Sequence, residues 1–261
     1  MEMIRISLIT ATLNSGRTLA NTLATVTKEN CVFEHVFVDG GSSDNTISIL
    51  KEYISENSNA RLVCQTGKGL YGALNDGVRN AKGDYVFFLH SDDTLASSGV
   101  VDRYEEIARQ RRPDLVYADA EFANADGIVC RIWKSGKYSR RKCLLGWMPP
   151  HVTCLTRRGL FEEIGFFEER GTTAADYEWL LRVLWDDRHS VAYLPEVTVN
   201  MRVGGASSAS IRSRIRANIA DGQSWRKRIG VLFFIPQIAK PMRKLLQFRL
   251  LYRKGRKAAS R

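Results

Sequence analysis

Apolar strand patterns and amphipathic helix patterns alternate through the first hundred residues, and this alternation constrains the fold more than any other feature. Short apolar runs typical of strands occupy residues 4–13, 34–40, 60–65 and 84–89. Helical spacing fills the intervals between them, at residues 15–30, 42–57 and 69–83. Strands joined by helices of this length form βαβ units. The sequence therefore predicts an α/β domain built on a parallel sheet.

The second half of the chain adds a predicted hairpin to this pattern. Residues 115–134 carry two strand patterns on either side of Asp126-Gly127, a dipeptide typical of tight hairpin turns. A helix pattern at 174–188 then precedes a strand pattern at 190–203. We therefore expect a Rossmann-like mixed, mainly parallel sheet flanked by helices over residues 1–210.

Net charge is distributed unevenly along the chain. Residues 211–261 contain 15 Lys and Arg and one acidic residue, Asp221, a net charge of +14. The preceding 210 residues hold 24 basic and 27 acidic residues, a net charge of −3. Apolar residues interleave the basic tail, which we interpret as amphipathic helices on an anionic membrane surface. The alternative is helices packed back on the domain with a solvated basic face. We do not expect nucleic acid as the partner, because no recognised nucleic-acid-binding module stands beside the tail.

The cellular location is predicted from three features. No apolar run approaches the ~18–20 residues that a membrane span needs. The first apolar stretch runs directly into polar turn residues, so we expect a strand there rather than a signal peptide. The five cysteines form no C-x-x-C pair, which favours reduced thiols. We expect a cytoplasmic protein, peripherally associated with the inner face of the cytoplasmic membrane.

Polar residues gather where three of the predicted strands end. They are TATLN at residues 10–14, DGGSSD at 39–44 and HSDD at 90–93. Ligands of open parallel sheets bind at the carboxyl ends of the strands, so these clusters define one expected site. Asp92 and Asp93 repel each other at such a strand tip; a divalent metal, a helix N-terminus or solvent exposure would compensate. G-x-G-x-x-G and G-x-x-x-x-G-K-[ST] motifs are absent, which argues against the usual dinucleotide fold and a P-loop.

Four motifs together carry a family resemblance. TATLN, VDGGSSDNT, GLYGALNDGVRNAKGDYVFFLHSDD and AADYEWLLR occur in the order and the approximate spacing of one family. They resemble the inverting, family-2-type glycosyltransferases with a GT-A fold, of the bacterial polysaccharide and cell-envelope type. The resemblance covers about residues 4–205 and leaves the basic tail outside it.

The resemblance implies a nucleoside-diphosphate sugar as the donor, UDP-linked by preference. Asp39 would accept hydrogen bonds from the base or the ribose, with Thr10 and Asn14 beside the nucleoside. The expected donor-binding residues are Thr10, Thr12, Asn14, Asp39, Gly40, Lys68, Asn75, Ser91 and Asp93. For Asn75, a solvated helix face is the competing interpretation.

The HSDD cluster falls on the family's D-x-D metal motif. The resemblance implies Mg²⁺ or Mn²⁺ bridging carboxylate and diphosphate oxygens. Asp92 is the expected primary ligand, with Asp93 as a supporting ligand or a contact to the sugar. His90 stands where the family more often has a carboxylate. It either coordinates Mn²⁺ or forms a hydrogen bond nearby, and we favour the hydrogen bond.

Inverting transfer requires a base to remove the proton of the acceptor hydroxyl. Asp176 in AADYEWLLR occupies the family's catalytic-base position. Glu178 is the second candidate, although on a helix it would point elsewhere. His151 lies in a segment that resembles the family's acceptor side, where it either contacts the acceptor or a phosphate or packs in the fold. Arg202 begins RVGGAS, which resembles a closing loop, but whose glycines fit an ordinary turn equally well.

These inferences predict a hexosyltransferase-type glycosyltransferase. It would move a sugar from its donor to a hydroxyl of a lipid-linked or cell-surface glycan. The alternative is a nucleotide-sugar-binding or nucleotidyltransferase-like protein with a nucleic-acid- or membrane-binding tail. TATLNSGR, at residues 10–17, is a poor match to the phosphate loop that nucleotidyl transfer uses.

Overall fold

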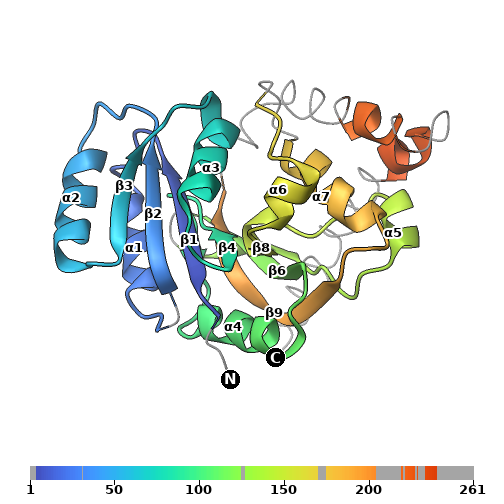
Figure 1. Cartoon of the computed structure of the whole chain (residues 1–261), viewed down its shortest axis with the longest axis horizontal. Coiled ribbons are helices and arrows are strands. Elements are labelled where there is room, and N and C mark those ends of the chain that lie inside the picture. The colour runs from blue at the N-terminus through green and yellow to red at the C-terminus, as the bar shows by residue number, and fades with distance from the viewer. Residues whose placement is uncertain are drawn as a thin grey trace, which may run out of the picture.

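The computed structural model describes residues 4–30, 32–124, 127–169, 175–203, 219, 221–226, 228 and 233–239. Its first half alternates strands and helices as the sequence predicts (Figure 1). The elements are β1 (Ile6–Thr12), α1 (Leu19–Val26), β2 (Val32–Asp39), α2 (Thr46–Glu56), β3 (Ala60–Cys64), α3 (Gly69–Asn80) and β4 (Tyr85–Phe88).

The second half contains the predicted hairpin, helix and last strand, together with several short elements. These elements are β5 (Thr94–Leu95), α4 (Val100–Arg111), β6 (Leu115–Ala123), β7 (Val129–Trp133), α5 (Arg140–Leu144), η1 (His151–Thr153), β8 (Leu155–Arg157), α6 (Leu160–Ile164), α7 (Ala175–Trp185) and β9 (Val191–Arg202). The strands β6 and β7 pair antiparallel, as expected for the hairpin, although residues 125–126 of its turn lie outside the described residues.

Within the described residues, nine strands form one mixed sheet. The order is β3-β2-β1-β4-β8-β6-β9-β5, with β7 paired on β6. The four strands of the first half are parallel neighbours, which confirms the predicted βαβ arrangement. The short strand β8 runs antiparallel to both β4 and β6, and so joins the first half of the sheet to the second.

Helices cover both faces of this sheet and bury two sets of strand side chains. On one face α1, α2 and α4 cover residues such as Leu8 and Phe37. On the other face α3, α6 and α7 cover residues such as Ile9 and Val38. The side chains of a strand alternate between faces, so both sets come from β1 and β2. The carboxyl ends of β1, β2 and β4 therefore open at one edge between two packed layers.

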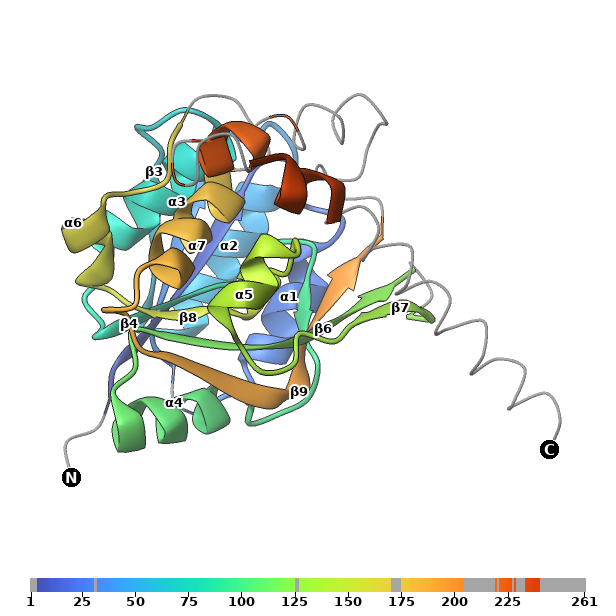
Figure 2. The same cartoon turned by 90° about the vertical axis from the view of Figure 1, so that its right-hand side faces the viewer.

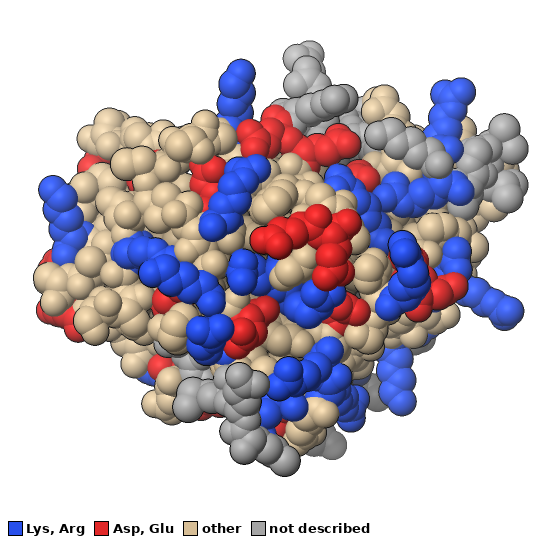
Figure 3. Space-filling model, viewed as in Figure 1, with Lys and Arg blue, Asp and Glu red and all other residues tan. Residues whose placement is uncertain are grey.

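Part of the basic tail is described, and it lies beside the domain. Both views place the helical residues among 219–239 next to α5 and α7 (Figures 1 and 2). The predicted domain boundary at residue 210 falls outside the described residues. Lys and Arg are spread over the face in Figure 3, with acidic side chains between them. Among the described residues, no helix has the length and apolar character to cross a bilayer.

Candidate functional site

Asp39 ties together the loops that follow β1 and β2. Its Oδ1 accepts hydrogen bonds from Thr12 Oγ1 (2.8 Å) and Ser42 Oγ (2.6 Å). Its Oδ2 accepts from the backbone N–H groups of Gly41 (2.9 Å) and Ser42 (2.8 Å). Burial alone would raise the pKa of Asp39, but these hydrogen bonds hold it below its usual range. Asp39 is therefore ionised, and its own loop uses its acceptor positions.

Gly40 and Asn14 shape the rest of this rim. The Gly40 N–H donates to the Thr12 carbonyl oxygen (2.9 Å), which extends the strand pairing by one residue. The chain then turns at Gly41, whose φ of +91° favours glycine. Asn14 also has a positive φ, and its Oδ1 accepts the Ser43 N–H (2.9 Å). Four of the predicted donor residues, Thr12, Asn14, Asp39 and Gly40, thus share one rim.

Two other predicted donor residues lie inside the fold. Thr10 is fully buried, and its Oγ1 is 3.0 Å from His35 Nε2. Asn75 is 1% exposed, which makes the solvated-face interpretation wrong. Its Nδ2 donates to the Phe167 carbonyl oxygen (2.9 Å), and its Oδ1 accepts the Phe167 N–H (3.0 Å). Both side chains therefore spend their hydrogen-bonding capacity within the protein.

Lys68 lies on the surface, immediately before α3. Its side chain is exposed, and its backbone N–H donates to Glu169 Oε2 (3.0 Å). The backbone contact fixes the start of α3 against the segment that follows α6. The side chain itself extends into solvent.

Asp92 and Asp93 follow β4 and have different surroundings. Asp93 is 4% exposed, and its Oδ1 accepts the N–H of Arg202 at the end of β9 (3.0 Å). Burial, together with the charge of Asp92, raises the pKa of Asp93 to about 7. Burial also raises the pKa of Asp92. Ser91 Oγ lies 2.7 Å from Ser15 Oγ, so this loop is joined to the loop after β1.

The chemistry of this pair fits a divalent cation that is shared with a phosphate. A cation would offset both the desolvation and the mutual repulsion of Asp92 and Asp93. Among the residues that the structure describes, no group of three or more His, Cys, Asp and Glu could hold a metal alone. Magnesium sites on phosphate substrates often use only one or two carboxylates, with water and phosphate completing the shell. Asp92 also lines an open pocket of about 240 Å³, together with Arg202.

Asp176 belongs to a hydrogen-bonded series of four polar side chains, which we call the Asp176 network. The Tyr71 hydroxyl donates to Asp176 Oδ1 (2.8 Å), and His151 Nδ1 is 3.0 Å from Oδ2. On the far side of its ring, His151 Nε2 lies 2.8 Å from His90 Nε2. The Asp176 network thus extends from α3 through the start of α7 and η1 to the loop after β4. The predicted hydrogen bond of His90 is present, with His151 as its partner.

The contacts and the pKa shifts indicate which side chains of the Asp176 network carry protons. Burial opposes protonation of His151, but the adjoining Asp176 carboxylate raises the pKa of His151 above its ordinary value. Burial opposes ionisation of Asp176, but His151 and Tyr71 hold its pKa well below the usual range. Burial lowers the pKa of His90 to about 3. We therefore assign an ionised Asp176, a protonated His151 that donates from both nitrogens, and a neutral His90 that accepts at Nε2.

Glu178 lies outside the Asp176 network, as expected for a residue two positions further along a helix. Arg182 pairs with one of its carboxylate oxygens, and Arg228 Nη2 lies 3.2 Å from the other. Burial opposes ionisation of Glu178, but the two arginines lower its pKa. Its carboxylate is therefore committed to ion pairs within the protein.

Two contacts of the predicted site residues were not predicted from the sequence. Tyr71 stands in a quoted motif, yet nothing local indicates that its hydroxyl reaches Asp176, 105 positions away. Arg228 belongs to a basic tail whose arginines look alike in sequence. Only the fold distinguishes the one that pairs with Glu178.

Comparison with known proteins places this chain in a family. The family described as "Glycosyl transferase family 2" matches residues 7–165, well over half of the chain. The chain belongs to glycosyl transferase family 2. The glycosyltransferase is also 30% identical over 209 residues to a "PGL/p-HBAD biosynthesis glycosyltransferase" of Mycobacterium bovis, covering 78% of this chain and 79% of the relative.

Solved structures support the GT-A fold of the glycosyltransferase. S. aureus TarS 1-349 in complex with UDP-GlcNAc matches with a TM-score of 0.68 and 18% identity, over 85% of this chain and 65% of that one. This chain thus spans slightly less than two thirds of that protein. Mannosyltransferase PcManGT from Pyrobaculum calidifontis, in complex with GDP-Man and Mn²⁺, matches with a TM-score of 0.65 and 17% identity, over 92% and 70%.

Proposed function

We propose that this glycosyltransferase moves a sugar, with inversion, from a nucleoside-diphosphate sugar to a hydroxyl of a lipid-linked or cell-surface glycan. The observation that carries the proposal is one shared edge. An ionised Asp176 contacts His151, which contacts His90, and His90 lies in the same loop as Asp92 and Asp93. The UDP-GlcNAc and GDP-Man named with two structures of similar fold support the class of donor. Within this class we propose a UDP-sugar.

Asp176 is the proposed general base. In a single inverting displacement, the acceptor hydroxyl attacks the anomeric carbon opposite the leaving diphosphate and loses its proton. Asp176 starts each turnover ionised because His151 and Tyr71 stabilise its charge, so it is ready to take that proton. Such positioned bases contribute roughly 10²–10⁴-fold to a rate.

Asp92, supported by Asp93, is the proposed holder of Mg²⁺ or Mn²⁺. When bound, the cation supplies positive charge that stabilises the departing diphosphate. Asp92 lines the open pocket, whereas Asp93 is buried and holds the Arg202 backbone. Asp92 is therefore the better-placed ligand, and Asp93 fixes the loop that carries it.

The rim formed by Asp39, Asn14 and Gly40 is the proposed nucleoside site. For Asp39 to accept a ribose or base hydrogen bond, it must release one of its four present donors. The Ser42 hydroxyl is the simplest to exchange because it can rotate to another acceptor. Asp39 would thus bind a nucleoside without a movement of the loop backbone.

The tail supplies the proposed contact with a membrane surface. Its described residues include three exposed apolar side chains on one short helix, Phe234, Ile235 and Ile238. They stand within a segment of net charge +14, a combination typical of helices on anionic lipid. The double variant Phe234→Ser/Ile238→Ser should lose co-sedimentation with vesicles of anionic phospholipid. Unchanged sedimentation would reject this contact.

A donor screen tests the proposed reaction. UDP-, GDP- and dTDP-sugars are incubated with the enzyme and Mn²⁺ or Mg²⁺, and sugar transfer and donor hydrolysis are measured. We expect metal-dependent turnover of one nucleotide class, loss of transfer in Asp176→Asn, and retained donor binding in that variant. Full transfer by Asp176→Asn would reject the assignment of the base. Release of pyrophosphate from a nucleoside triphosphate would indicate nucleotidyl transfer instead.

A further inference from the structure

A segment of the tail packs directly on α7, the helix that carries Asp176. Trp225 is 1% exposed, and its Nε1 donates to the Tyr177 hydroxyl (2.8 Å). Its ring meets Trp185 edge-on, with the centroids 5.1 Å apart and the planes at 83°. Tyr177 and Trp185 lie about two turns apart on the same face of α7. One tail residue therefore contacts the helix at both ends.

Arg228 adds an electrostatic contact at the start of the same helix. Its side chain is 16% exposed and pairs with Glu178, which is 12% exposed. Glu178 also binds Arg182, whose Nη1 donates to the carbonyl oxygens of Ile164 (3.0 Å) and Phe166 (3.2 Å). The tail is thus linked through Glu178 to the segment that follows α6.

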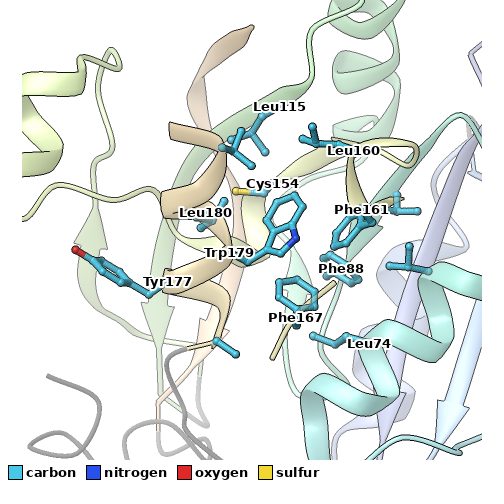
Figure 4. Packing of buried hydrophobic residues seen from close by; sticks show 14 of the residues in the cluster. Leu74, Phe88, Leu115, Cys154, Leu160, Phe161, Phe167, Tyr177, Trp179 and Leu180 are labelled. Carbon is cyan, nitrogen blue, oxygen red and sulfur yellow. The ribbon is translucent and has the colours of Figure 1, made fainter. Parts of the chain in front are cut away.

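These contacts lie immediately beside Asp176 in the chain. Trp179 points into the core, where it stacks on Phe161 with centroids 4.3 Å apart. Tyr177 extends from α7 in the opposite direction to Trp179, as Figure 4 shows, and both residues belong to the same buried hydrophobic cluster. The domain core therefore packs one side of the helix, and the tail packs the side that carries Tyr177.

We propose that the tail residues 221–226 and 228 are part of the transfer site and that Trp225 and Arg228 are positioning residues for Asp176. This inference rests on the proposed role of Asp176 as the base. By holding Tyr177 and Glu178, the two tail residues fix the rotation of the first turn of α7. That rotation sets where the Asp176 carboxylate meets the attacking hydroxyl. Misplacement of a reacting group by about 1 Å can cost on the order of 100-fold in rate.

A double-mutant cycle on the full chain tests this inference. Arg228→Gln, Glu178→Gln and the double variant are assayed for transfer kcat, donor KM and melting temperature. We expect each single variant to lower kcat about tenfold with little change in donor KM, because the donor is held by other residues. The double variant should be no slower than the slower single variant, because the two side chains act as a pair. Arg228→Lys should recover part of the lost kcat, because an ammonium can still reach Glu178.

Two further variants separate positioning from simple packing. Trp225→Phe keeps an aromatic ring but removes the donor to Tyr177, and should also lower kcat. Arg188→Gln is the matched control, because it removes an arginine near the end of α7 that is 83% exposed and pairs with Asp186. Its kcat should equal that of the wild type.

The outcomes distinguish this inference from the proposed function. A lower melting temperature with unchanged kcat per folded enzyme would mean that Trp225 and Arg228 only stabilise the fold, and would overturn the inference. A raised donor KM with unchanged kcat would overturn it as well. If Asp176→Asn is inactive while Arg228→Gln and Trp225→Phe keep full kcat, only the inference fails. If Asp176→Asn transfers sugar normally, the proposed function itself fails.

Discussion

His151 Nδ1 lies 3.0 Å from Asp176 Oδ2, so an imidazole from η1 holds the proposed base on α7. The other carboxylate oxygen accepts the Tyr71 hydroxyl at 2.8 Å. Both donors come from elements that pack against the sheet, Tyr71 from α3 and His151 from η1. The carboxylate is therefore fixed in orientation and in ionisation by the fold itself, before a substrate enters.

Replacing His151 should change the pH dependence of transfer. In His151→Gln the amide can still donate a hydrogen bond, but the positive charge beside Asp176 is gone. The pKa of Asp176 then rises, because that charge is a main cause of its low value. A general base must be ionised, so the acidic limb of the kcat/KM profile should move to higher pH.

The control for this experiment is His189→Gln, which removes an imidazole paired only loosely with Asp186, at 4.0 Å. Its profile should match the wild type. An acidic limb that stays in place in His151→Gln would contradict the coupling between His151 and Asp176.

Tyr71→Phe should slow transfer without unfolding the protein. The change removes one hydroxyl that donates to a charged acceptor and leaves the ring packed against Phe167. Hydrogen bonds to charged groups are worth about 1.5–3 kcal/mol, which corresponds to about 10- to 150-fold in rate, so kcat should fall at least about tenfold. Tyr85→Phe, which removes a hydroxyl bonded to the Pro113 carbonyl oxygen, is the matched control and should keep its kcat. Equal kcat values for the two variants would exclude a role for the Tyr71 hydroxyl.

Metal removal should abolish transfer, and Asp92→Asn should raise the metal concentration required. A chelator is expected to stop turnover and added Mn²⁺ or Mg²⁺ to restore it. Asn keeps the shape of Asp92 but not the charge that attracts the cation. The activity of Asp92→Asn should therefore half-saturate at a higher metal concentration than that of the wild type, measured by titrating metal into chelator-treated enzyme. Transfer that is indifferent to the chelator would refute the metal proposal.

The first half of the fold was predictable because each of its strands and helices is long enough to show its own period. The strand β8 was not, because its three residues, Leu155–Arg157, show no period and gain their structure only from pairing with β4 and β6. Site residues followed the same division. The polar ends of the strands were visible in sequence, so the rim around Asp39 was predictable.

Pairings across the fold were beyond the reach of the sequence. The sequence marks His90 and His151 as two separate candidate site residues. They are 61 positions apart, and nothing local shows that they touch. Thr10 looked like a ligand-binding residue because it stands near the end of a strand. Its partner, His35, reaches it only through the parallel register of β1 and β2. Residue type indicates chemistry, but register decides which face a side chain occupies.

The buried His35 should make the protein less stable as the pH falls below the pKa of an ordinary histidine. His35 lies in β2, and its ring is tilted by 36° against that of Phe37 with the centroids 3.9 Å apart. Burial lowers its pKa to about 3, against about 6.5 in an unfolded chain. Between those values the unfolded state binds a proton that the native state does not, so the free energy of unfolding falls as the pH drops from about 6.5 towards 3.

By pH 5 this loss should reach about 2 kcal/mol, from roughly 1.4 kcal/mol for each unit of pH below 6.5. His35→Gln removes the titrating group, so its melting temperature should depend less steeply on pH between 6.5 and 5, even if its stability at pH 7.5 is lower. The dependence should persist in part, because burial lowers the pKa of His90 to about 3 as well. If His35→Gln keeps the full slope, the acid sensitivity comes from other groups, because His35 is then not a neutral, buried imidazole in the native state.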